Sequence, residues 1–199
     1  MRIGPRYNMK CEEIKVNNFK IKWVNSRKYL GVEILSGTKF QLCFKEAKRK
    51  FFYAVNSILG NLGGVNSPFV ALHLIMSQAT PHLLYGINAC HLNKSSINSL
   101  EYSYYNSVFA KLFKTCDNNV IYNCQFDAGY LNFNILYEYN TLTFLKKLVD
   151  NEVIKFGTNI DTDDHLLYEK LLAKYNIDRD SLFVNKKYFF TYFEKLLNN

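Results

Sequence analysis

Three histidines form the most regular set of reactive side chains, because His73, His82 and His91 recur every nine residues. Imidazole is a common zinc ligand, so such a series suggests a metal site. Nine residues of an α-helix make about two and a half turns, however, so successive members lie on alternate sides. Pro81 interrupts the helical geometry as well. We therefore expect no metal site from these histidines.

The other reactive groups also lack partners at useful spacings. Cys116 and Cys124 are eight residues apart, with no matching histidine pair. Ser67 stands before a proline, as a helix cap does, and no motif places a base near it. Glu12 and Glu13 are adjacent, and neighbours on a strand point to opposite faces, so they cannot share a metal. The sequence thus predicts no catalytic residue, no metal site and no cofactor bound by this chain.

The N-terminal segment has the alternation of β-strands. Residues 11–16 and 19–23 alternate on either side of an Asn-Asn dipeptide typical of a tight turn, which predicts a hairpin. Residues 28–35 predict a third strand, with Gly31 as a bulge or a point of close backbone approach. Three strands make a poor sheet alone, so we expect neighbouring strands from a missing upstream portion.

From residue 41 the apolar residues recur at three and four positions, which predicts helices. Helices over 41–62, 67–80 and 95–115 should pack as a three-helix unit, and Pro81 should end or kink the second. The expected fold class is α+β, predominantly α, with a short antiparallel N-terminal piece before the helices. The expected domains are 1–38, 39–116 and 117–199, the last with helices near 120–126, 133–154, 163–175 and 180–197.

Positive charge is concentrated in the first third of the chain. The net charge is +8 over 199 residues, but residues 1–60 hold 13 lysines and arginines against four glutamates, a net of +9. The remaining residues therefore carry a net charge of −1. Such a field attracts a polyanion to the N-terminal third, although a solvated basic face explains the charge equally well.

The cysteine content and the lengths of the apolar runs indicate in which cellular compartment the protein is found. The five cysteines include no CxxC pair, and their odd number does not fit a secreted disulfide framework. No apolar run reaches the roughly 18 residues of a membrane span, and the basic N-terminus lacks the apolar part of a signal peptide. We expect an intracellular protein, in the cytoplasm or the nucleus, with no membrane partner.

Several ordered stretches carry a similarity to a known family. They are residues 1–6 (MRIGPR), Trp23 followed by 27–32 (RKYLGV), then 47–58 (AKRKFFYAVNSI), 81–86 (PHLLYG) and 112–114 (LFK). Their order resembles the strand after the palm, the primer grip and the thumb helices of LINE-type, jockey-like non-LTR retrotransposon reverse transcriptases. The similarity covers residues 1–126. It implies a fragment of an RNA-directed DNA polymerase of a mobile element.

The chain also departs from that family's pattern. The family's polymerase site uses palm aspartates, including a Tyr-x-Asp-Asp turn, to hold two Mg²⁺ ions. The first aspartate here is Asp117, beyond the thumb-like helices. The resemblance therefore implies a chain that is inactive alone, with the palm and fingers portion of the same polyprotein as a partner.

The resemblance places the primer grip at Lys28, Tyr29, Leu30 and Gly31. Gly31 has no Cβ and would let the backbone approach a primer strand, while Tyr29 would pack against a sugar. The alternative is a central strand whose tyrosine and leucine fill a core.

Backbone-contacting residues are expected on the first long helix. Lys45, Lys48, Arg49 and Phe52 fall on one stripe opposite its apolar face. Together with Arg27 they are expected to contact phosphates of an RNA–DNA hybrid or another duplex, weakly and with strong salt dependence. The alternative is an ordinary charged outer face.

Two other functions remain open for this sequence. The first is a stand-alone basic helical module that binds nucleic acid or protein without catalysis. The second is an enzyme of another class, which ranks last because no acid–base or nucleophile constellation stands out.

Overall fold

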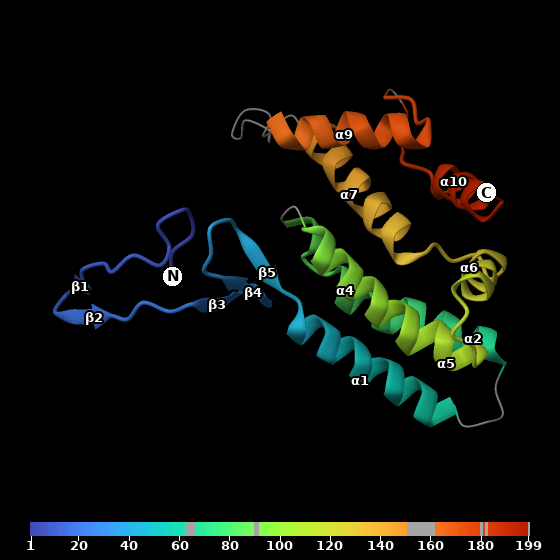
Figure 1. Ribbon diagram of the computed structural model, residues 1–199, viewed down its shortest axis with the longest axis horizontal. Helices are drawn as coiled ribbons and strands as arrows, with labels where there is room; N and C mark the ends of the chain where they lie inside the picture. The colour runs from blue at the N-terminus through green and yellow to red at the C-terminus, as the bar shows by residue number, and fades with distance from the viewer. Residues whose placement is uncertain (63–66, 90–91, 151–161, 180, 182, 199) are drawn as a thin grey trace.

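The computed structural model describes residues 1–62, 67–89, 92–150, 162–179, 181 and 183–198. Short antiparallel strands lie within the first 43 residues, and helices dominate the described parts that follow (Figure 1). This arrangement confirms the expected α+β class with a predominance of helix. The strands fall into a separate hairpin and a small sheet that lies next to the first helix.

The separate hairpin consists of β1 (Ile14–Val16) and β2 (Phe19–Ile21). Between the strands, Asn17 and Asn18 have φ angles of 47° and 64°. Two consecutive positive φ angles are typical of a type I′ turn, whose twist matches that of the strands, and asparagine tolerates this conformation well. The predicted tight turn is therefore confirmed. In Figure 1 this hairpin extends away from the helices.

The sheet begins with a second hairpin, which the sequence did not predict. β3 (Ser26–Tyr29) and β4 (Val32–Leu35) are joined by Leu30 and Gly31, whose φ angles are 45° and 84°. The prediction of one strand over 28–35 is wrong, because the chain reverses inside it. Gly31 lies in the turn rather than at a bulge. The apolar pattern gave no sign of the turn, since leucine is an unusual residue for a positive φ.

A third strand, β5 (Gln41–Cys43), pairs with β4 and completes the sheet. Helix α1 (Lys45–Leu62) begins after it, so the predicted helix over 41–62 starts too early. Leu42 and Phe44 are buried, and an apolar residue at every second position suits a strand as well as the edge of a helix. Residues 41–43 form a strand rather than the start of a helix because their backbone pairs with β4.

The second predicted helix is longer than expected and changes geometry part-way. The Ser67 hydroxyl accepts a hydrogen bond of 3.3 Å from the first turn of α2 (Pro68–Leu74), which confirms the cap. A π-helical segment, η2 (Ile75–Ala79), leads into α3 (Thr80–Leu84). Pro81 therefore does not end the helix. It has no N–H to donate, and the wider turn just before it lets the helical path continue.

The third predicted helix, over 95–115, consists of α4 (Lys94–Tyr104), η4 (Tyr105–Ala110) and α5 (Lys111–Phe113). Its residues pack with those of α1, η2 and α3 around one apolar core. Phe51 and Val55 of α1 are fully buried there. Burial of such a side chain contributes about 1.5–3 kcal/mol, so this core fixes which side of α1 faces outward.

The C-terminal helices share a second apolar core, in which Phe189 and Phe193 are buried almost completely. Ile121 belongs to the first core, while Phe126 packs against the second, so the helix that carries both lies where the two cores meet. Four elements lie where shorter helices were predicted, although residues 151–154, 180 and 182 of those predictions fall outside the described residues. They are α6 (Asn118–Asp127), α7 (Phe133–Asp150), α9 (Thr162–Tyr175) and α10 (Lys186–Leu197). A short 3₁₀ turn, η3 (Ile87–Ala89), precedes them.

One contact between α4 and α7 predicts a pH dependence of stability. The Asn134 amide donates a 2.9 Å hydrogen bond to the carboxylate of Glu101. Burial raises the pKa of Glu101, against the opposite effect of hydrogen bonds from Asn134 and Tyr122. The folded state therefore holds a proton on Glu101 more tightly than the unfolded state does. Stability should fall as pH rises from the ordinary pKa of a glutamate through the raised pKa.

We expect Glu101→Gln to remove this slope and to raise the free energy of unfolding at neutral pH by about 0.5 kcal/mol or more. Glutamine keeps an oxygen for Asn134 but carries no charge to bury. Urea unfolding at a series of pH values from acid to neutral measures the effect. If the free energy of unfolding changed with pH equally in the unchanged protein and in Glu101→Gln across the mildly acidic range, the role of Glu101 would be contradicted.

Candidate nucleic-acid interface

The tip of the β3–β4 hairpin rests on the end of α3. The Tyr85 hydroxyl donates a 2.8 Å hydrogen bond to the Leu30 carbonyl. A Cβ on Gly31 would lie 3.4 Å from the Tyr85 ring, and one on Gly86 would lie only 2.8 Å from Val32 Cγ2. Two stretches far apart in sequence, 27–32 and 81–86, are thereby held against one another at positions where glycine lets the backbones approach.

The hairpin tip presents its side chains to solvent. Tyr29 is 65% exposed and Leu30 is 73% exposed, so neither fills a core as the central-strand alternative requires. Successive residues of a strand point to opposite faces, so Arg27 and Tyr29 share one face and Lys28 lies on the other. The structure therefore does not bring Arg27 and Lys28 to a single surface.

The stripe on α1 is mostly exposed, but its cations differ in their surroundings. Lys45, Arg49 and Phe52 are exposed, while Lys48 is half-buried. The Lys48 ammonium donates a 2.8 Å hydrogen bond to Ser99 Oγ on α4. Lys48 therefore lies on the α4 side of the stripe.

Arg49 is engaged within its own helix. Its Nε and Nη2 atoms donate to the two carboxylate oxygens of Glu46, at 3.0 and 2.8 Å. The pair lies at the surface, where water screens the charges, so it contributes little to stability. A phosphate can therefore displace Glu46 from Arg49 at little cost.

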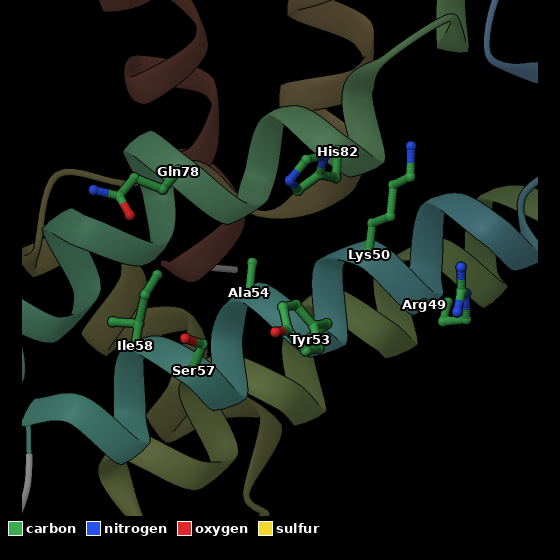
Figure 2. Close-up of a pocket in the computed structure, with 8 residues that line it drawn as sticks. All are labelled: Arg49, Lys50, Tyr53, Ala54, Ser57, Ile58, Gln78 and His82. Atoms are coloured by element: carbon green, nitrogen blue, oxygen red, sulfur yellow. The ribbon is translucent and has the colours of Figure 1, made fainter.

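A groove runs between α1 and the η2–α3 segment, next to the stripe, and Arg49 of the stripe also lines it. One hollow of about 600 Å³ is lined by residues of α1 with Gln78 and His82 opposite, as Figure 2 shows. A second hollow, of about 610 Å³, reaches from Lys50 and His82 to Lys28 and Tyr85 at the hairpin. Lys50 and His82 line both hollows, so the two lie side by side, and together they are called the groove.

Sequence reasoning missed this groove. Lys50 follows Arg49 directly, but one residue turns a helix by about 100°, which places Lys50 on the α3 side. The signal was the spacing of Lys50, Tyr53 and Ser57, which lie on one face of α1 as i, i+3 and i+7. No spacing in the sequence could show that Tyr85 and Lys28 join them, because that depends on how the hairpin rests on α3.

Two carboxylates also lie near the hairpin, Glu33 and Glu46. A hydrogen bond of 2.7 Å from Ser26 is the main cause that lowers the pKa of Glu33. The hydrogen bond from Arg49 is the main cause that lowers the pKa of Glu46, with further attraction from Lys28 and Lys50. Both are thus ionised carboxylates already held by donors. Glu33 and Glu46 balance the charges of Lys28 and Lys50 in the second hollow, and Arg49, which lines the first hollow, gives the groove as a whole three cations against two carboxylates.

Within the ranges that the structure describes, no three His, Cys, Asp or Glu residues come together as a metal-binding group. His73 and His82 are exposed on α2 and α3, and His91 lies outside the described residues. Cys116 and Cys124 are free thiols, as are Cys11 and Cys43.

Comparison with protein-family models, with curated proteins and with solved structures finds no match to this chain. The resemblance to reverse transcriptases therefore stays a prediction. None of the helices in the described part of the chain is both long and apolar enough to cross a membrane.

Proposed function

We propose that this chain is the primer-grip and thumb part of a reverse transcriptase of the non-LTR retrotransposon type, and that it binds the backbone of a template–primer duplex. The observation that supports this most directly is the 2.8 Å bond between Tyr85 and Leu30. It joins the grip-like hairpin to the thumb-like helices, so that the exposed tip is held next to the helices that carry the cations.

The chemistry required is neutralisation of phosphates without reading of bases. Lys45, Lys48 and Arg49 supply cations along one helix, and Arg27 supplies another from β3. Phe52 adds an exposed aromatic surface beside them. An RNA–DNA hybrid has a wide, shallow minor groove with 2′-hydroxyls, which shape-selective contacts of this kind can follow.

Charge reversal on α1 tests the proposal. We expect the double variant Lys48→Glu/Arg49→Glu to bind an RNA–DNA primer–template at least about tenfold more weakly at low salt, because two phosphate contacts become repulsions. Fluorescence anisotropy with a labelled hybrid measures the affinity, and circular dichroism verifies the fold.

The matched control is Lys186→Glu/Lys187→Glu at the start of α10, where two adjacent exposed lysines allow the same change of net charge. Negative charge at a helix N-terminus does not disfavour the helix. Equal affinities for both double variants would show that net charge alone matters and would end the proposal for α1.

A further inference from the structure

The groove between α1 and the η2–α3 segment combines cations with exposed aromatic rings. Tyr53, on α1, is 78% exposed and lines one end, and Tyr85 is 60% exposed and lines the other. Lys50 and His82 lie between them, and Figure 2 shows both beside the Tyr53 end. The order along the groove is therefore aromatic, basic, aromatic.

We propose that this groove binds single-stranded nucleic acid. A strand with unpaired bases alternates phosphates with planar rings, and a groove of cations and exposed tyrosines offers a contact for each. A poly-glutamate chain would contact Lys28 and Lys50 but would present no planar ring to Tyr53. The Ser57 hydroxyl and the Gln78 amide line the same groove and add hydrogen-bonding groups that suit base edges.

The groove is a channel at the surface between neighbouring helices, because α1 is packed against η2 and α3. Along α1 the lining runs from Glu46 to Ile58, or about 18 Å at 1.5 Å per residue, which is room for about five stacked nucleotides.

The groove and the stripe of α1 would recognise different parts of a nucleic acid. The stripe uses cations for a duplex backbone, whereas the groove adds tyrosine rings for bases. The inference rests on the proposed function in that both surfaces belong to one nucleic-acid-binding unit. A strand in the groove and a duplex on the stripe would lie on neighbouring faces of α1 with Arg49 between them, as at a junction between paired and unpaired regions.

Removal of one ring tests the groove without a change of charge. We expect Tyr53→Ala to weaken binding of a labelled oligothymidylate of about 12 nucleotides by about tenfold, because one base loses its stacking surface. Tyr53→Phe keeps the ring and should bind as the unchanged protein does. Tyr188→Ala, at an exposed tyrosine of α10, serves as the matched control and should have no effect.

Two further probes separate this inference from the proposed function. An abasic strand of the same length carries the phosphates without bases, and it should bind all the groove variants weakly and equally. A blunt RNA–DNA duplex should bind Tyr53→Ala as well as it binds the unchanged protein.

Equal affinity of the thymidylate and abasic strands, or displacement of the thymidylate by poly-glutamate at equal charge, would overturn the groove proposal. Loss of duplex binding in Lys48→Glu/Arg49→Glu together with no effect of Tyr53→Ala would leave the proposed function intact and remove this inference alone.

Discussion

Binding to an RNA–DNA primer–template should weaken about a hundredfold when the salt concentration rises from about 50 to about 200 mM. Each lysine or arginine that neutralises a phosphate releases a condensed counterion and adds about −0.9 to the slope of log affinity against log salt. Arg27, Lys45, Lys48 and Arg49 are the proposed contacts, so the expected slope is about −3.6. Anisotropy titrations at a series of KCl concentrations measure it.

The double variant Lys48→Glu/Arg49→Glu should lower the magnitude of this slope by about two, because two phosphate contacts are lost. The control variant Lys186→Glu/Lys187→Glu should keep the full slope. A slope near zero for the unchanged protein would contradict backbone binding. An unchanged slope in the α1 variant would assign the contacts to other cations of the chain.

Gly86→Ala should lower the free energy of unfolding by about 2 kcal/mol and should detach the β3–β4 hairpin from α3. Gly86 has a φ of 70°, which costs a residue with a Cβ about 1–2 kcal/mol. The new Cβ would also lie 2.8 Å from Val32 Cγ2, so the hairpin must shift. Chemical denaturation measures the stability, and hydrogen exchange at β4 reports the detachment.

Gly60→Ala is the matched control for this substitution. Gly60 lies in α1, and a Cβ there would meet no atom within 4 Å. Alanine should therefore raise stability by about 0.5–1 kcal/mol, because it restricts the unfolded chain and favours the helix. Similar effects of the two substitutions would contradict the close packing between the hairpin and α3. Weaker nucleic-acid binding by Gly86→Ala alone would link that packing to the proposed interface.

Local features of the fold could be predicted because short-range physics decides them. The Asn17-Asn18 turn, the Ser67 cap and the amphipathic spacing of α1 each depend on a residue and its near neighbours. The charge of the first third and the stripe of Lys45 and Arg49 also follow from the sequence alone, since helical geometry fixes which residues share a face.

Only the tertiary structure decided how these elements meet. The turn at Leu30 was not visible in the pattern, because its positive φ is favoured by hairpin pairing and by the hydrogen bond from Tyr85 rather than by the leucine itself. The same contact brings Lys28 to the groove of Lys50 and His82. Residues more than 50 positions apart become neighbours through packing, which no local periodicity encodes, so the groove could be found only in the folded chain.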